Sequence, residues 1–404
     1  MSGERELLVR LDRQAAEPLA RQLGDALRDA IRCGKLRPGT RLPATRTLAA
    51  DLGVSRGVVV EAYEQLTAEG YLDSRAGGAG TFVKAIELRG AGSGPGRRLL
   101  HRETPTAVLD ARPGAPDLAL FPRALWANAR RRVLHQAADL DLGYPAPWGV
   151  PALREQLAGY LGRVRAAIGS PQTIVVTTGA SQALSLMARV LLTRGHRDLA
   201  VEDPSNPVHR ALLVKYGIGI VPVAVDDEGI DVAALQRTGA RAVLVTPAHQ
   251  FPSGVLMSPA RRQALLRWAR DADGVIIEDD YDAEYRYDGR STMCLQGEDP
   301  MRVALVGSTS KTLAPALRLG WIMPPMGLVR AVAELKRDDD LGSEVLTQLA
   351  FAHLLDTGRY DKHLRTTRDV YRHRREHLAG ELGIHVPDWR IKGLAAGQHI
   401  SVEL

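Results

Sequence analysis

The sequence predicts an α/β protein with a separate, smaller helix-turn-helix unit at its N-terminus. Helical hydrophobic patterns within residues 18–69 are interrupted by a short glycine-containing turn, which is typical of a helix-turn-helix. From about residue 109 onward, short apolar runs alternate with helical patterns, as they do in mainly parallel α/β sheets. Several of these runs end in polar or charged residues. Because ligands bind at such strand ends, we expect the larger part to carry a ligand site.

The composition indicates a globular protein without a membrane span. At 404 residues the chain is long enough for two or three domains. Apolar residues make up 45% and charged residues 25%, and no apolar run reaches the roughly 18 residues that a transmembrane helix needs. The first residues lack a signal peptide core, and Cys33 and Cys294 match no metal-ligand spacing. We therefore expect a cytoplasmic protein without a metal site. Its net charge of +6 permits nucleic-acid binding without requiring it.

Residues 10–84 are predicted to form a winged helix. An apolar stripe at four-residue spacing predicts an amphipathic helix over residues 18–34. Thr45 can cap a short helix, Gly53 makes the turn after it, and Ser55 can cap a second helix. Two strands around a glycine-rich tip follow and complete the wing.

Basic and polar residues of this unit suit a DNA duplex. The first turn of the second helix would present Ser55, Arg56 and Val58 to the major groove. Arg46 on the preceding helix and Arg75 near the wing could meet phosphates. The alternative is a small helical interaction module whose arginines are solvated surface residues.

A family resemblance favours DNA binding. Residues 18–84, with LRPGTRLPATRTLAADLGVSRGVVVEAYEQLTAEGYL and GGAGTFV, resemble the winged helix of GntR-type bacterial regulators. The resemblance covers the whole unit and implies binding to double-stranded DNA. Residues 85–108 are rich in Gly, Arg and polar side chains without apolar periodicity, which predicts a linker.

The stretch RVALVGSTSKTLAPALRLGWIM has the residues of a pyridoxal phosphate site. A buried strand is followed by Ser308, Ser310 and a single lysine, Lys311. Burial lowers the pKa of a lysine, and the neutral amine can react with an aldehyde. The two hydroxyls and the guanidinium of Arg318 suit a phosphate. The alternative is an ordinary strand end with an exposed lysine.

Two other strand ends carry matching groups. The backbone amides of Ala180 and Ser181 begin a helix after a strand at residues 173–177, and such amides can hold a phosphate. Asp279 follows another strand and could pair with a protonated pyridine nitrogen, while Tyr281 could donate to the phenolic oxygen of the ring. Taken singly, the Ala180–Ser181 start could be an ordinary strand-to-helix turn, and Asp279 could be a helix cap or part of an ion pair. Their combination with the lysine stretch favours the cofactor site.

The larger part also resembles a known fold. Residues 109–404 resemble a fold-type I aminotransferase domain, through RPGAPDLALFP, TPAHQFPSG, IIEDDYDAEYRYDGR and GSTSKTLAPALRLGW. Together with the winged helix, this is the architecture of MocR-type transcriptional regulators, the GabR- and PdxR-like group. The resemblance implies a pyridoxal 5′-phosphate (PLP)-dependent transferase-like domain with a mainly parallel sheet.

The resemblance implies a role for each matching residue. Lys311 becomes the lysine that reacts with the cofactor aldehyde, Asp279 the partner of the ring nitrogen, and Tyr281 the partner of the ring hydroxyl. Tyr144 matches a tyrosine that reaches the phosphate of the neighbouring subunit, which implies a homodimer with shared sites. The phosphate ligands become Ser308, Ser310, Arg318, Ala180 and Ser181.

Two departures from the family pattern stand out. Where the family commonly reads EDPGY, this sequence has Ser205 and Asn206, so Asn206 stands where an aromatic ring is expected over the cofactor. Weaker cofactor binding or an altered ligand pocket is the expected result. The chain also ends at HISVEL, where relatives continue, which predicts an incomplete small domain with no assignable arginine for an amino-acid carboxylate.

The sequence thus predicts a PLP-dependent DNA-binding transcriptional regulator that senses an amino compound or PLP itself. One alternative is a working amino acid aminotransferase with a secondary DNA-binding module. Another is a DNA-binding regulator that has lost its cofactor. The effector, the operator, and the choice between activation and repression are open at this stage.

Overall fold

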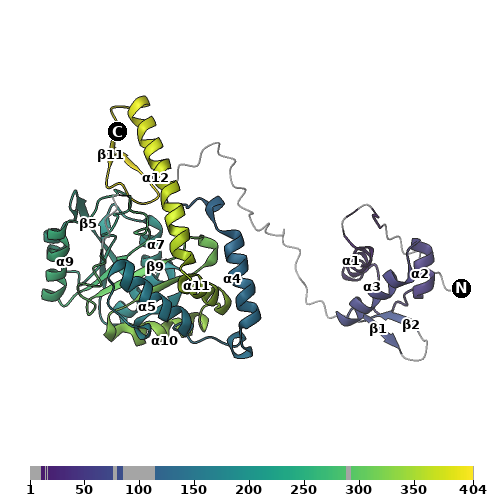
Figure 1. Ribbon diagram of the computed structural model, residues 1–404. Helices are drawn as coiled ribbons and strands as arrows, with labels where there is room; N and C mark the ends of the chain where they lie inside the picture. The colour runs from purple at the N-terminus through teal and green to yellow at the C-terminus, as the bar shows by residue number, and fades with distance from the viewer. Residues whose placement is uncertain are drawn as a thin grey trace. The chain divides into compact units, whose positions relative to one another are not determined.

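The chain divides into two compact units in the computed structural model, Met1–Val108 and Leu109–Leu404. The structure describes residues 11–13, 15, 17–75, 80–84, 114–287 and 293–403. The predicted linker at 85–108 and the tip of the wing lie outside these residues. Each unit is described by itself (Figure 1).

The smaller unit is a winged helix, as the sequence predicted. Its elements are α1 (Leu19–Arg32), α2 (Thr45–Leu52), α3 (Arg56–Ala68), β1 (Leu72–Arg75) and β2 (Gly80–Val83). The two strands pair antiparallel, and the apolar faces of the three helices meet in one core. That core is centred on Leu23, Leu27, Leu48, Val59 and Leu66.

Two predicted helix caps are not formed. Thr45 is the first residue of α2, and Ala44 occupies the cap position without a side-chain hydrogen bond. The prediction for Thr45 was wrong because its backbone already has helical geometry. Ser55 does occupy the cap position of α3, but its hydroxyl accepts no capping hydrogen bond. Gly53 ends α2 with φ of 61°, a left-handed conformation that glycine adopts without strain.

The larger unit is built on an eight-stranded, mainly parallel sheet in the order β3-β10-β9-β8-β7-β4-β5-β6. Only β10 and β6 run antiparallel to their neighbours. The carboxyl ends of the other strands therefore meet at one edge of the sheet. The strands are β3 (Val175–Thr177), β4 (Asp198–Asp203), β5 (Gly219–Asp226), β6 (Gly229–Ile230), β7 (Ala242–Val245), β8 (Val275–Asp279), β9 (Val303–Ser308) and β10 (Gly320–Met323).

Helices cover both faces of this sheet (Figure 1). One face packs against α6, α7 and α10, and the other against α5 and α11 in one half and α8 and α9 in the other. The long α12 runs beside a β11-β12 hairpin. The helices and remaining strands are α4 (Arg123–Gln136), α5 (Pro151–Arg165), α6 (Ala180–Thr193), α7 (Pro207–Lys215), α8 (Val232–Thr238), α9 (Pro259–Asp271), α10 (Val329–Asp340), α11 (Val345–Asp356), α12 (Arg359–His385), β11 (Arg390–Lys392) and β12 (Ser401–Glu403).

The period of two along each strand assigns its side chains to opposite layers. Ile276 of β8 packs in the α8/α9 layer, whereas Ile277 packs in the α6/α10 layer. Strands buried on both faces carry continuous apolar runs, which explains why they could be located from the sequence. In the described part of the chain, no helix combines the length and the apolar character that a membrane crossing requires.

Candidate cofactor site and DNA-binding surface

Lys311 lies at the carboxyl edge of the sheet, three residues after β9 ends. Its side chain is partly buried, and Nζ donates a hydrogen bond to the backbone oxygen of Gly114. Burial lowers the pKa of the Lys311 amine from its usual value, although the carboxylates of Asp282 and Asp279 oppose this shift. The amide side chain of Gln398, from the C-terminal segment, donates to the Lys311 backbone oxygen at 2.8 Å.

Asp279 ends the neighbouring strand β8 and is buried. Its Oδ2 lies 3.5 Å from Nδ1 of His209 on α7, whereas Oδ1 has no hydrogen-bond partner among the described residues. Burial raises the pKa of Asp279, while His209 and Lys311 oppose the rise. An unpaired buried carboxylate oxygen is costly, so this atom is suited to a ligand that brings a proton or a positive charge.

Tyr281 belongs to a buried polar network that sequence reasoning did not identify. Its hydroxyl lies 3.0 Å from Nδ1 of His249, and Asp282 Oδ2 lies 2.9 Å from the same nitrogen. His399, near the C-terminus, stacks obliquely against His249 with ring centroids 4.7 Å apart. His249, Asp282 and His399 each place one potential metal-ligand atom within 4.8 Å of the others. The His249 nitrogen is already within hydrogen-bonding distance of two partners, so these contacts are a hydrogen-bonded network around Tyr281.

The turn before α6 and Arg318 form a cradle for an anion. Gly179 precedes α6 with φ of 117°, and a Cβ there would lie 3.2 Å from Nη2 of Arg318. The glycine therefore allows the guanidinium to approach the backbone closely. The carbonyl of Gly179 accepts from the amides of Gln182 and Ala183. The preceding amides, of Ala180 and Ser181, are those that a helix leaves unbonded at its start.

The two serines lie on the Lys311 side of this edge. Ser308 is buried at the end of β9, and its hydroxyl accepts a hydrogen bond from the Ser310 amide at 3.4 Å. The structure thus brings the Gly179 turn and Arg318 together. It also brings Lys311 close enough to Asp279 and Asp282 for the carboxylates to act on its pKa.

Asn206 has a structural use that the sequence comparison did not indicate. Its side-chain oxygen accepts from the amides of Val208 at 3.0 Å and His209 at 3.4 Å, which caps α7. The same helix turn carries His209 to Asp279. The sequence signal for His209 was its position three residues after a capping asparagine that itself follows a strand end.

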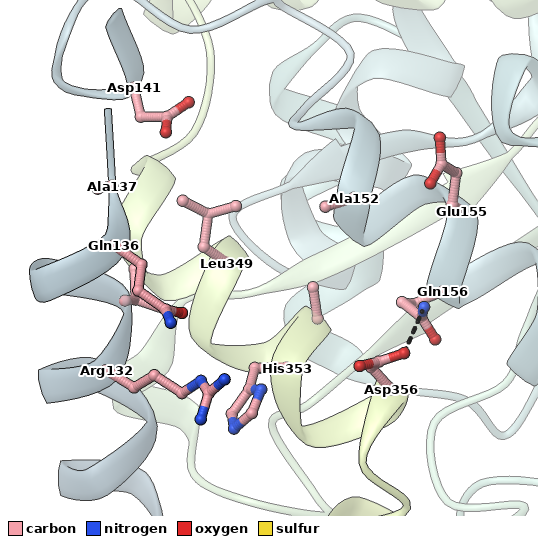
Figure 2. Close-up of a pocket in the computed structure, with 12 residues that line it drawn as sticks. Arg132, Gln136, Ala137, Asp141, Ala152, Glu155, Gln156, Leu349, His353 and Asp356 are labelled. Carbon is pink, nitrogen blue, oxygen red and sulfur yellow. Dashed lines mark hydrogen bonds between the residues drawn. The ribbon is translucent and has the colours of Figure 1, made fainter. Parts of the chain in front are cut away.

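Tyr144 lies at the surface of the larger unit. It is 90% exposed and follows a short 3-10 turn, η2 (Asp139–Leu142). Close to this turn, a cavity of about 310 Å³ opens between α4, α5 and α11 (Figure 2). Arg132 and Gln136 of α4 face His353 of α11 across it. The lining of this cavity contains none of the predicted cofactor ligands.

The predicted DNA-contacting residues lie at the start of α2 and α3. Arg46, Ser55 and Arg56 are exposed and Val58 is half-buried. Arg56 Nε donates to Thr45 Oγ1 at 3.4 Å, which connects the two helix starts. Arg75 ends β1, and its side chain lies outside the described part.

An additional basic residue lies beside the wing. The exposed Arg41 pairs with Phe82 in an isolated bridge, and a Cβ on Gly80 would lie 2.8 Å from Arg41 Nε. In the sequence, Arg41 directly precedes the Leu42-Pro43 pair before α2, and this position was the signal that could have identified it.

Comparisons with known proteins match both units. Residues 19–83 match the family described as bacterial regulatory proteins, gntR family, and residues 112–396 match aminotransferase class I and II. The probable rhizopine catabolism regulatory protein MocR of Rhizobium meliloti is 34% identical, over 94% of this chain and 80% of its own length. The pyridoxine biosynthesis transcriptional regulator PdxR of Corynebacterium glutamicum is 33% identical, over 98% and 85%. Among solved structures, a kynurenine aminotransferase of Pyrococcus horikoshii has a TM-score of 0.66 and 28% identity, covering 73% of this chain and 75% of that one.

Proposed function

We propose a sensing role on the premise that this chain belongs to the MocR-type transcriptional regulators, which join a GntR-type helix-turn-helix to an aminotransferase class I and II domain. In this proposal the larger unit holds PLP and responds to an amino compound, or to PLP itself. The response changes how the winged helix binds promoter DNA in the cytoplasm. The protein acts as a homodimer.

The aminotransferase class I and II domain implies PLP as the cofactor, and the described residues fit it. The orphaned Oδ1 of Asp279 is the observation that carries the proposal, because a protonated pyridine nitrogen would supply the missing donor. The close approach of Arg318 to the Gly179 turn, beside free helix amides, suits the phosphate. When bound, PLP supplies a reactive aldehyde and an electron-withdrawing ring.

Each residue contributes through its charge or its proton. Lys311, with its lowered amine pKa, is available as a nucleophile toward the aldehyde. Asp279 holds a proton on the ring nitrogen, and His209 at 3.5 Å orients its other oxygen. Tyr281 donates to the ring oxygen while His249 and Asp282 fix the position of its hydroxyl. Arg318 and the amides of the Gly179 turn neutralise the phosphate.

An amino compound would act as the effector by binding at the Lys311 site and shifting the equilibrium between two states of the protein. The structure gives Lys311 Nζ one partner outside that site's acids, the backbone oxygen of Gly114. A ligand shifts such an equilibrium only by its differential affinity for the two states.

The test is a DNA-binding titration with the whole chain. Fluorescence anisotropy would compare the promoter upstream of the protein's own gene with a scrambled duplex. Each duplex would be tested without cofactor, with PLP, and with PLP plus candidate amines. We expect a promoter preference of at least about a thousandfold and a change in promoter affinity on adding PLP or one of the amines. Equal promoter affinity in all three states, with PLP verifiably bound, would contradict the sensing role.

A second candidate is an amino acid aminotransferase with a secondary DNA-binding module. It is favoured by the presence of Lys311, Asp279 and Tyr281 in one site, since sensing and transamination need the same groups. Steady multiple turnover with an amino acid and a keto acid would support it, provided that Lys311→Ala abolishes the turnover. Equal affinity for promoter and scrambled DNA in the same preparation would decide for the enzyme.

A further inference from the structure

A buried lysine behind the Gly179 turn has no part in the function described so far. Lys336 lies on α10, and its side chain is 0% exposed. Its Nζ donates to both carboxylate oxygens of Asp340, at 3.0 and 2.8 Å, and to Gln182 Oε1 at 3.3 Å. Burial lowers the pKa of Lys336, while the hydrogen bond and charge of Asp340 oppose the shift. A buried charge of this kind is retained only with well-placed partners.

The partners of Lys336 fasten the turn that precedes α6. Gln182 Oε1 also accepts the backbone amide of Thr178 at 2.9 Å, and Gln182 Nε2 donates to Asp340 Oδ2 at 2.8 Å. Thr178 and Gln182 flank Gly179, whose carbonyl accepts the Gln182 amide at 3.1 Å. The network therefore fixes both sides of the residue that adopts φ of 117°.

Asp340 extends the same network toward Tyr144. Its Oδ1 accepts the amide of Gly342 at 2.9 Å. Gly342 has φ of 116°, and a Cβ there would lie 2.7 Å from Cγ of Pro145. Pro145 directly follows Tyr144 in the chain. Asp340 thus bonds Gln182 beside the phosphate cradle on one side, and on the other it bonds Gly342, which lies close to Pro145.

We propose that Lys336 is a positioning residue that, with Asp340 and Gln182, sets the geometry of the phosphate cradle and so the affinity for the phosphate group of the cofactor. Lys336 acts through Gln182 and does not touch the cofactor. Its charge keeps Asp340 ionised, Asp340 orients the Gln182 side chain, and Gln182 fixes the backbone of Thr178 next to Gly179. The inference rests on the proposed assignment of the phosphate to Arg318, Ala180 and Ser181.

The experiment compares PLP with pyridoxal, which lacks the phosphate, in binding titrations on the full chain. Lys336→Met should weaken PLP binding on the order of tenfold, the scale on which supporting residues behind a ligand shell act. It should leave pyridoxal affinity within about twofold, because the lysine and carboxylate groups are intact. Lys336→Gln and Asp340→Asn are included in case the methionine variant does not fold, and both should lose the same preference for PLP.

Two further variants make the outcomes distinguishable. Arg262→Met breaks a different ion pair, the one between the buried Arg262 and the more exposed Glu298 at 2.9 Å. This pair lies in the α8/α9 layer, so the variant controls for general destabilisation. Arg318→Ala tests the phosphate site directly. Loss of PLP preference in the Lys336 and Arg318 variants but not in Arg262→Met supports the inference.

Other results overturn it. If only Arg318→Ala loses the preference, the phosphate site stands and Lys336 has no positioning role. If neither variant loses it, the phosphate assignment is wrong and the inference fails with it. Equal weakening of PLP and pyridoxal in Lys336→Met, matched by Arg262→Met, would mean that Lys336 serves stability alone.

Discussion

At the carboxyl edge of the sheet, the pKa values of Lys311 and Asp279 are shifted from their ordinary values. Burial favours the neutral amine of Lys311 and the protonated acid of Asp279. Each residue type could be predicted from its place after a strand. His249 and Lys336 could not, because the 246–257 loop and α10 bring them to the site only through tertiary packing. For His209, the one signal was the capping asparagine three residues before it.

Lys311 is the residue whose chemistry is easiest to check. With PLP added, the protein should absorb in the visible range, and borohydride should fix the cofactor covalently on Lys311. Lys311→Ala should abolish the fixation, because Lys311 is the only lysine in the stretch 302–323. Peptide mass spectrometry locates the label. A label on another lysine would refute the assignment.

Glu202 predicts a measurable pH dependence of stability. It is the second-last residue of β4, is buried, and accepts from the Thr246 amide at 3.0 Å and the Thr246 hydroxyl at 2.6 Å. Burial raises its pKa from 4.5 to about 7, and the hydrogen bonds from Thr246 and Gln250 oppose that rise. The folded protein therefore binds this proton more tightly than the unfolded chain does. That stabilisation is complete below about pH 4.5 and is lost as pH rises through about 7.

Replacing Glu202 with glutamine removes the titration and keeps the shape. The difference in unfolding free energy, Glu202→Gln minus wild type, should therefore increase as pH rises from 5 to 7. The increase should be at most about 1.4 kcal/mol per pH unit. Urea unfolding at several pH values measures the difference, and the other buried acids cancel because both proteins contain them. The exposed Glu376→Gln serves as the control. Parallel pH profiles for Glu202→Gln and wild type would contradict the raised pKa.

Elements differ in how far their local sequence determines them. Buried strands such as β7 and β8 were located correctly because continuous apolar runs have few other uses. The cap of α2 was located wrongly, one residue too late. The exact first residue of a helix depends on tertiary packing, which the local sequence does not show. Asn206 was compared with an aromatic residue, whereas the chain uses it to begin α7.

The two helix starts of the winged helix predict different consequences on DNA. We expect Arg56, at the start of α3, to reach base edges and Arg46, on α2, to meet a phosphate. Arg56→Ala should therefore cost about 1–3 kcal/mol on the promoter and relax the choice of one base. Arg46→Ala should weaken promoter and scrambled DNA alike and reduce the salt slope by about one. Anisotropy at several salt concentrations distinguishes the two patterns, and identical behaviour of both variants would contradict the assignment.

At the scale of the whole molecule, both units could be predicted because each contains a long match to a known family, over residues 19–83 and 112–396. The exposed apolar surface around Tyr144 could not be predicted from the sequence. In the described structure, Leu140 is 93% exposed, Leu142 65% and Tyr144 90%. They lie together on η2 and the residues after it, near the cavity between α4, α5 and α11. Clustered apolar exposure of this kind marks an interaction surface.

A second copy of the chain is the partner that this surface is expected to bind, with Tyr144 reaching the neighbour's phosphate cradle. Sedimentation should therefore give a dimer without DNA. Leu140→Lys should shift it toward monomer, since a charge in an apolar interface is poorly solvated. Leu378→Lys, at a leucine 48% exposed on α12, is the matched control and should leave the dimer intact.

Tyr144→Phe separates assembly from cofactor binding. It keeps the apolar ring, so the dimer should persist. It removes a hydroxyl that would bond to a charged phosphate, a bond worth about 1.5–3 kcal/mol, so PLP affinity should fall by about tenfold or more. Pyridoxal affinity should stay the same, because pyridoxal offers that hydroxyl no phosphate. In Leu140→Lys, PLP affinity should in addition rise with protein concentration, because only the dimer has a complete cradle. A stable wild-type monomer with full PLP affinity would exclude the shared site.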